Sequence, residues 1–112
     1  MRRILLVDDE PFVRPVLVEM LECLGYDVLE AVDGVHALEM LEAHAVDLVL
    51  SDIRMPRLDG VALARQIGAR WPGLLVLLMT GHGPGVDTGA WPVLPKPFLL
   101  EDLEAFLARA AP

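Results

Sequence analysis

The chain has 112 residues with a formal net charge of −8, and 54% of its residues are hydrophobic. This length suffices for one domain with one core, and the apolar content excludes a disordered chain. The negative charge argues against binding to nucleic acid, because contacts with phosphates need a basic surface. We therefore expect a single domain over residues 1–112 that has no nucleic-acid partner.

Three further observations predict where the protein resides. No apolar run approaches the roughly 18 residues that a transmembrane helix needs, and the N-terminus enters a strand pattern without the layout of a signal peptide. Cys23 is the single cysteine and lies in a helical pattern, which favours a small buried hydrophobe in a reducing compartment. The sequence thus predicts a cytoplasmic protein with no membrane partner.

Strand-like and helix-like segments alternate along the chain, which favours an α/β fold with a parallel sheet. Strands are predicted over 1–7, 28–32, 46–51, 74–79 and 91–94. The first helix is expected to begin near Pro11 with Asp9 as its cap, although Pro15 implies a distorted first turn or a later start. Its expected inward residues are Phe12, Val16, Met20, Leu21 and Leu24.

Three further helices are predicted by the spacing of apolar residues. The second covers roughly 35–44, the third follows the 54–60 loop and ends at Trp71-Pro72-Gly73, and the last covers about 100–110. Their expected inward residues are Ala37, Leu38 and Leu41; Val61, Leu63, Ala64 and Ile67; and Leu103, Phe106 and Leu107.

The segment 80–95 is the least regular part of the chain. Four glycines and three prolines interrupt both helix and strand patterns there. A crossover between parallel strands usually needs a dozen or more residues, and this segment is barely that long. The helix between the fourth and fifth strands is therefore expected to be shortened or absent.

Acidic residues follow two of the predicted strands at the point where each strand ends. Asp8 and Asp9 follow the first strand, and Asp52 follows the third. In an open parallel sheet, ligands bind outside the carboxyl ends of the strands. Three carboxylates gathered there would repel one another unless a cation lay between them. The sequence therefore predicts a cation site at this edge.

The order of four short motifs resembles the receiver domain of bacterial two-component response regulators. The resemblance covers essentially the whole chain, and each motif comes at the end of a predicted strand. The motifs are Leu6-Val7-Asp8-Asp9-Glu10-Pro11; Asp52 with Met55-Pro56 and Asp59-Gly60; Thr80-Gly81; and Lys96-Pro97-Phe98. The resemblance implies a flavodoxin-like, doubly wound sheet of five parallel strands in the order 2-1-3-4-5.

Asp52 is the candidate phosphoryl acceptor, because a carboxylate is a competent nucleophile that gives an acyl phosphate. Mg²⁺ is the expected cofactor, since it prefers oxygen ligands and retains several waters. The resemblance implies that Asp9 and Asp52 bind the ion directly and that Asp8 binds it through water. The backbone carbonyl of Arg54 is the remaining expected ligand from the protein.

Two further residues are expected to act on the phosphoryl group. Lys96 carries a mobile ammonium that can pair with Asp52 and then with the phosphoryl oxygens. Thr80 offers a hydroxyl whose movement toward the phosphate is the switch step of the family. The resemblance also implies a cis Lys96–Pro97 bond, which proline makes accessible.

Each candidate also has a plainer interpretation. Asp9 could be a helix cap, Asp52 a turn former, Lys96 a surface charge and Thr80 an ordinary strand end. Their joint occurrence favours a functional site. His82 and Arg54 are candidates for tuning dephosphorylation, whereas His36 and His44 are assigned no role. Pro56, Asp59 and Gly60 are expected to shape a loop.

Departures from the family concern the output of the signal. Val93 stands three residues before Lys96, where many members carry an aromatic residue that swings inward with the threonine. With this substitution and the shortened connection before it, the chain resembles receivers that stand alone or are attached to hybrid sensor kinases. Because the sequence stops at residue 112, no effector domain and no DNA-binding output are expected.

Three functions remain open. The first is a receiver, not an enzyme, that takes a phosphoryl group from a sensor histidine kinase or a histidine phosphotransfer protein and resets by slow self-hydrolysis. The second is a haloacid-dehalogenase-like phosphatase, although that family needs a D-x-D motif after its first strand and Asp8 and Asp9 are adjacent. The third is a receiver-like binding module that is never phosphorylated. A monomer or weak homodimer is expected.

Overall fold

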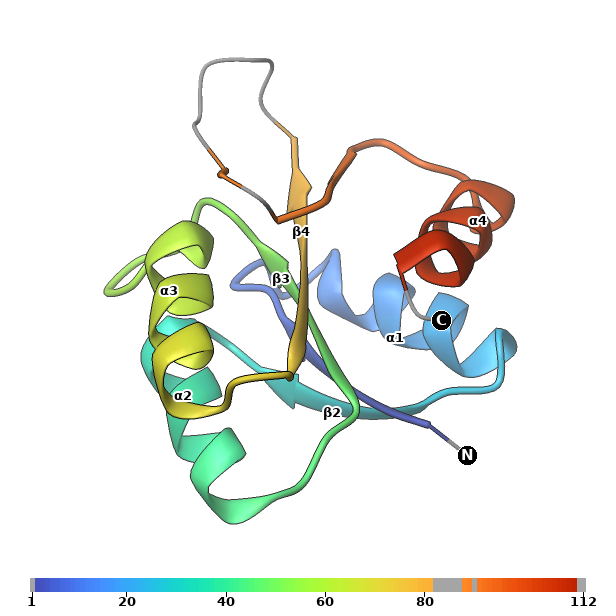
Figure 1. Ribbon diagram of the computed structural model, residues 1–112. Coiled ribbons are helices and arrows are strands. Elements are labelled where there is room, and N and C mark those ends of the chain that lie inside the picture. The colour runs from blue at the N-terminus through green and yellow to red at the C-terminus, as the bar shows by residue number, and fades with distance from the viewer. Residues whose placement is uncertain (1, 82–87, 90, 111–112) are drawn as a thin grey trace.

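The computed structural model describes residues 2–81, 88–89 and 91–110. Five parallel strands form one sheet in the order β2-β1-β3-β4-β5 (Figure 1). The predicted fold class and strand order are confirmed. The strands are β1 (Arg3–Val7), β2 (Asp27–Ala31), β3 (Leu48–Asp52), β4 (Leu75–Thr80) and β5 (Val93–Pro95).

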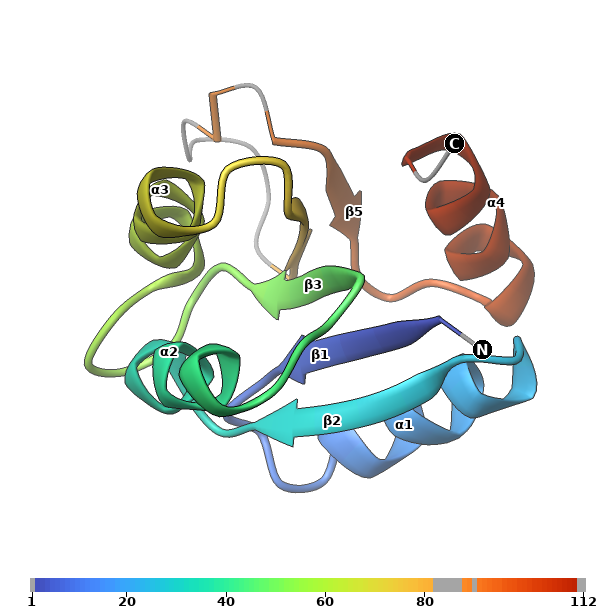
Figure 2. The same cartoon turned by 60° about the horizontal axis from the view of Figure 1, so that its bottom comes forward.

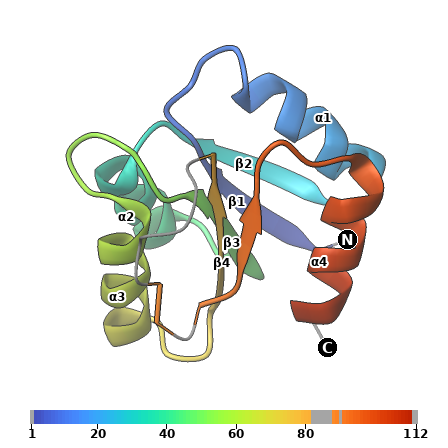
Figure 3. The same cartoon turned by 90° about the horizontal axis from the view of Figure 1, so that it is seen from above.

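Helices cover both faces of the sheet. Helices α2 (Gly34–Ala43) and α3 (Gly60–Arg70) lie on one face, and α1 (Arg14–Cys23) and α4 (Leu100–Ala110) lie on the other, as Figures 1 and 3 show. Successive strand residues point to opposite faces. Leu5 and Val7 accordingly pack with the α2 and α3 side, whereas Ile4 and Leu6 pack with the α1 and α4 side. Two apolar layers therefore hold the sheet between them.

The inward faces of the last three helices follow the sequence prediction closely. Every residue expected to face inward on α3 and α4 is buried, as are Ala37 and Leu41 on α2. Leu38 is half-buried and packs at the edge of the same core. Each fully buried leucine or isoleucine contributes about 1.5–3 kcal/mol to the stability of the fold.

The first helix departs from its prediction. It begins at Arg14 with Val13 as N-cap and no capping hydrogen bond from a side chain, so Asp9 does not cap it. Pro15 is accommodated in the first turn, where its missing N–H costs no helical hydrogen bond. Of the two expected alternatives, a distorted first turn or a later start, the later start is observed.

The apolar face of α1 matches the expected one only in part. Three of its five expected residues pack in the core, Leu21 fully and Met20 and Leu24 at its margin. Leu17 and Leu21 are buried, whereas Phe12 is 90% exposed and Val16 is exposed. Phe12 precedes the helix, so its spacing to later residues is not helical. Cys23 is exposed rather than buried, because it lies about 200° around the helix from Leu21.

The connection from β4 to β5 carries no helix among its described residues, 81, 88, 89, 91 and 92. Helix α4 follows β5, and the expectation of a shortened or absent helix is confirmed. Strand β5 has three residues and lies at the edge of the sheet, with a proline before it and one at its end. The Lys96–Pro97 peptide bond is cis, as predicted. In the described part of the chain, no helix has the length and apolar character needed to cross a bilayer.

Candidate functional site

The carboxyl ends of four strands gather the predicted site residues at one edge of the sheet. Asp8 follows β1, Asp52 ends β3, Thr80 ends β4 and Lys96 follows β5. Figure 2 shows β1 and β3 running in the same direction, side by side. These residues are far apart in the sequence, and the parallel pairing of their strands is what brings them together.

Two buried carboxylates share one ammonium group at this edge. Asp8 is 0% exposed and Asp52 is 5% exposed. The Nζ atom of Lys96 lies 3.0 Å from Oδ2 of Asp52 and 3.4 Å from Oδ2 of Asp8. A backbone hydrogen bond of 2.7 Å from Lys96 N to the carbonyl of Thr80 fixes the base of the lysine. The arrangement leaves the two acids with one compensating positive charge.

Burial and the neighbouring opposite charge shift the pKa of Asp52, and that of Lys96, in opposite directions. Burial raises the pKa of Asp52 above its ordinary value, and the nearby charge of Asp8 also raises it, whereas the hydrogen bond and charge of Lys96 only partly lower it. For Lys96, burial lowers the pKa, but the hydrogen bond and charge of Asp52 and the charge of Asp8 raise it by more. The ammonium is therefore held in its charged form, while ionisation of Asp52 is disfavoured until further positive charge arrives.

A third carboxylate completes an all-oxygen group. One carboxylate oxygen from each of Asp8, Glu10 and Asp52 lies within 4.8 Å of the other two. Asp8 Oδ1 accepts a 2.8 Å hydrogen bond from the Glu10 backbone N–H, a local turn that folds the loop back over the acid. Hard oxygen ligands with room for water suit Mg²⁺. The donor set therefore fits the predicted ion.

The remaining predicted ligands neighbour this group in the sequence. Asp9 is half-buried and does not belong to the set of mutually close carboxylates found among the described residues. Arg54 lies two residues beyond Asp52 at the start of the β3–α3 loop, and its side chain is exposed. His82, a candidate for tuning, lies outside the described residues.

Neighbouring elements hold the loops that carry these acids. Arg14 on α1 donates a 2.9 Å hydrogen bond from Nη1 to the carbonyl of Asp8 and a 3.0 Å bond from Nε to Glu30 on β2. On the other side, Asp59 caps α3 by accepting a 2.8 Å bond from Ala62 N. At Gly60 a Cβ atom would collide with the carbonyl oxygen of Asp52, so only glycine lets the helix start this close to the strand end.

Sequence reasoning did not single out Glu10 or Arg14. A signal for Glu10 was present in the run of three acids that follows the first strand, but the local turn between Asp8 and Glu10 decides which of these carboxylates come together. The contact of Arg14 with Asp8 had no such signal. It depends on where α1 begins, which was the least accurate part of the prediction.

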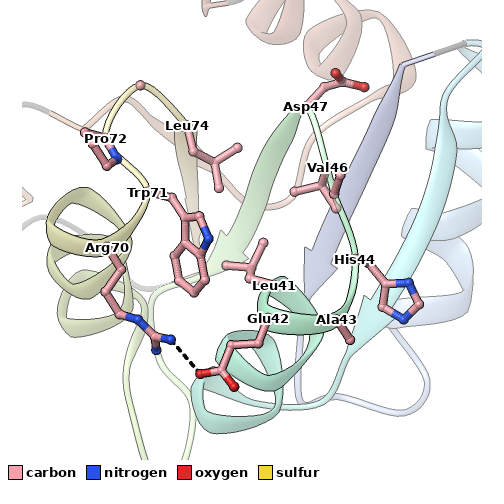
Figure 4. Close-up of a pocket in the computed structure, with 12 residues that line it drawn as sticks. Leu41, Glu42, Ala43, His44, Val46, Asp47, Arg70, Trp71, Pro72 and Leu74 are labelled. Atoms are coloured by element: carbon pink, nitrogen blue, oxygen red, sulfur yellow. Dashed lines mark hydrogen bonds and ion pairs between the residues drawn. The ribbon is translucent and has the colours of Figure 1, made fainter.

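A cavity lies at the opposite edge of the sheet. It has a volume of about 760 Å³ and is lined by the segments that precede β3 and β4. Figure 4 shows Trp71 at its wall and the ion pair between Arg70 and Glu42, whose Nη2 and Oε1 atoms are 2.5 Å apart. The Arg70 guanidinium also lies 4.5 Å from the centre of the Trp71 ring. None of the predicted site residues lines this cavity.

Comparisons with known proteins agree with the sequence resemblance. The family model of the response regulator receiver domain matches residues 4–108. The response regulator MprA of a Mycobacterium species (strain KMS) is 41% identical over 120 residues, covering 98% of this chain and 52% of that protein. The chain thus spans about half the length of the curated relatives that it matches.

Solved structures with the same fold include two that are similar along their whole length. One is the response regulator TrrA of Thermotoga maritima in complex with Mg²⁺-BeF, with a TM-score of 0.90, 31% identity, and coverage of 98% of this chain and 99% of that chain. The other is the receiver domain of a sensor histidine kinase of Pseudomonas aeruginosa with a magnesium ion coordinated in its active-site cleft. Its TM-score is 0.88 at 33% identity, covering 97% of this chain and 96% of that chain.

Proposed function

Because the chain belongs to the response regulator receiver domain family, we propose that it accepts a phosphoryl group on Asp52 in two-component signalling. The donor is a phosphohistidine on a sensor histidine kinase or a histidine phosphotransfer protein. One observation carries the proposal: two buried acids at the sheet edge, Asp8 and Asp52, share the ammonium of Lys96 at 3.4 and 3.0 Å.

The proposed reaction exchanges one bond for another. An ionised oxygen of Asp52 attacks the phosphorus atom, so an O–P bond forms while the P–N bond of the donor breaks and its electron pair stays on the imidazole nitrogen. Phosphoryl transfer depends mainly on positioning and charge neutralisation. Lys96 supplies both, because its ammonium already lies beside the accepting carboxylate and its pKa is raised, which keeps it charged.

Mg²⁺, when bound, neutralises the charge that the carboxylates and the phosphoryl oxygens would otherwise accumulate. We assign its direct protein ligands to Asp9, Asp52 and the backbone carbonyl of Arg54, with Asp8 acting through water. The mutual closeness of Asp8, Glu10 and Asp52 supports a cation at this position and adds Glu10 to its surroundings.

Thr80 is the proposed sensor of the phosphoryl group. Its backbone carbonyl accepts a hydrogen bond from Lys96 N, so the phosphoryl-binding lysine and the switch threonine are joined through the β4–β5 pairing. The chain acts as a signalling domain in the cytoplasm and not as an enzyme with a separate substrate, and slow hydrolysis of the acyl phosphate resets it.

The test is labelling with a small phosphodonor. Wild type with acetyl phosphate and Mg²⁺ should gain one phosphoryl group by intact-mass spectrometry, and EDTA should prevent the gain. Asp52→Asn should not be labelled. Equal labelling of Asp52→Asn and wild type would show that the acceptor is another residue.

The same experiment separates the receiver from a module that binds partners without phosphorylation. Such a module would take up no phosphoryl group from acetyl phosphate or from any phosphorylated histidine kinase. Labelling of wild type at Asp52 with either donor excludes it.

A further inference from the structure

The β3–α3 loop leaves the sheet directly after Asp52 and returns at Gly60. Its base is closed by a 2.7 Å hydrogen bond from Gly60 N to the carbonyl of Ile53. Within it, Leu58 N donates a 2.8 Å bond to the carbonyl of Pro56. Figures 2 and 3 show this loop arching past the end of α2. The loop thus reaches from Asp52 to α2, the helix that connects β2 to β3.

At its tip, the loop is tied to α2 by a two-bonded ion pair. Arg57 Nε lies 2.9 Å from Oδ2 of Asp33, and Arg57 Nη2 lies 3.0 Å from Oδ1. Asp33 is 7% exposed and is also the N-cap of α2, accepting a 2.8 Å bond from His36 N. The side-chain hydrogen bond from Arg57 holds the pKa of Asp33 below its ordinary value. A parallel pair of charge-assisted bonds of this kind fixes orientation as well as distance.

Two backbone features show that the loop is held closely against α2. A Cβ atom at Gly34 would lie 2.5 Å from the carbonyl oxygen of Leu58, so glycine is needed where loop and helix meet. Arg57 has a φ of +70°, a conformation that residues with a side chain rarely adopt. Glycine would adopt this backbone conformation without strain, so an arginine at this position indicates a role for its side chain.

We propose that Arg57 and Asp33 are positioning residues for the cation site. Their ion pair holds the β3–α3 loop, which carries the backbone carbonyl of Arg54 that the proposed function assigns to Mg²⁺. This inference rests on the proposed function, because it concerns the Mg²⁺ that the cluster binds. It adds a specific requirement: the site needs an ion pair to which none of the proposed ligands belongs.

The discriminating variant is Arg57→Gly. Glycine is unstrained at this φ, so the backbone conformation itself is not penalised. The substitution removes a positive charge, which by simple electrostatics should strengthen Mg²⁺ binding. A fall in affinity would therefore report the loss of positioning. Asp33→Ser is the reciprocal variant, since serine retains a capping oxygen for α2 but not the charge that pairs with Arg57.

The measurement is the dissociation constant for Mg²⁺, determined by isothermal titration calorimetry without any phosphodonor. Loss of a residue that orients ligands typically weakens metal binding by 10–100-fold, and we expect about a tenfold loss in either single variant. The double variant should be no weaker than the singles, because both remove the same ion pair. Arg57→Lys should rescue only part of the affinity, since lysine cannot form the paired bonds.

Arg70→Ala is the matched control. It also removes an arginine from an ion pair, with Glu42, but at the opposite edge of the sheet, and its Mg²⁺ affinity should equal that of wild type. Unchanged affinity in Arg57→Gly, or losses that add in the double variant, would overturn the proposal while leaving the proposed function intact. A wild-type protein without a titratable Mg²⁺ site would overturn both.

Discussion

Replacing Asp52 with asparagine should make the cation-free protein more stable. The carboxylate lies 3.0 Å from Lys96 Nζ and within 4.8 Å of an oxygen of Asp8. With an effective dielectric constant of about 20, these separations give about 5.5 kcal/mol of attraction and about 3.5 kcal/mol of repulsion. Burial of the charge is a further cost, and it is the largest of the effects that raise the pKa of Asp52. Because that pKa is raised, the costs exceed the attraction.

We expect Asp52→Asn to gain about 1–2 kcal/mol in free energy of unfolding at pH 7 in EDTA, the usual size for removal of one unfavourable interaction. In a domain of this length, 1 kcal/mol corresponds to about 4 °C in Tm. The gain should depend on pH. A raised folded-state pKa means that the wild-type penalty grows as pH rises from the unfolded-state value, near 4, through the folded-state value. The advantage of asparagine should therefore shrink as pH falls toward 4.

Thermal and urea unfolding followed by circular dichroism measure this difference. Added Mg²⁺ should reverse the order, because at a hundred times its dissociation constant a ligand adds about 2.7 kcal/mol to the protein that binds it. Glu19→Gln, which removes an exposed charge on α1, is the matched control and should show neither effect. A less stable Asp52→Asn in EDTA, or equal stabilisation of both proteins by Mg²⁺, would refute the reasoning.

Three other substitutions test the surroundings of the acids. Lys96→Met leaves two buried carboxylates without a counter-charge and should cost about 2–4 kcal/mol in urea unfolding, with much of the loss recovered in Mg²⁺. Phe12→Ala removes a side chain that is 90% exposed beside the acidic loop. The exposed ring is our candidate contact for a phosphorylated histidine kinase that docks beside the acids. Phe12→Ala should therefore slow transfer from that kinase about tenfold, while stability stays within about 0.5 kcal/mol and labelling by acetyl phosphate is unchanged. Equal slowing with both donors would contradict this docking role. Gly60→Ala should cost at least about 2 kcal/mol, because its Cβ would meet the Asp52 carbonyl. Gly68→Ala, in the same helix with open space at Cβ, should instead gain about 0.5–1 kcal/mol, and similar losses at both positions would contradict the packing argument.

The fold could be predicted because its central strands are short apolar runs that end at turn residues. Strands β1, β3 and β4 are buried almost throughout, as expected for a sheet covered on both faces. Their predicted boundaries differ from the observed ones by one or two residues. The strand order came from the resemblance and not from periodicity, since nothing in a run of leucines specifies its neighbour.

The first helix shows where the apolar pattern misleads. Phe12 and Val16 extend the spacing of the true inward residues, but Phe12 lies before the helix and Val16 faces solvent. Hydrophobicity alone cannot separate a residue that packs inward from one left exposed to solvent. The same ambiguity misplaced Cys23.

The acids and Lys96 could be located because each follows a strand, and the ends of parallel strands meet. Glu10, Arg14 and the Arg57–Asp33 pair could not be located in this way. Their contacts depend on a local turn, on the start of a helix and on a residue with positive φ. Such features follow from tertiary packing, which single-sequence periodicity does not contain.

The position of the site also explains how the fold tolerates it. Asp8 and Asp52 are buried charges that a protein selected only for stability would replace. They are attached to β1 and β3, strands whose other residues lie in the two apolar layers. Stability lost at the sheet edge is thereby offset by the buried apolar side chains of the same strands. Under the proposed function, a cation or phosphoryl group that binds at this edge would change its charge balance without unfolding the domain, and that tolerance is the condition for a local charge event to be read as a change of conformation.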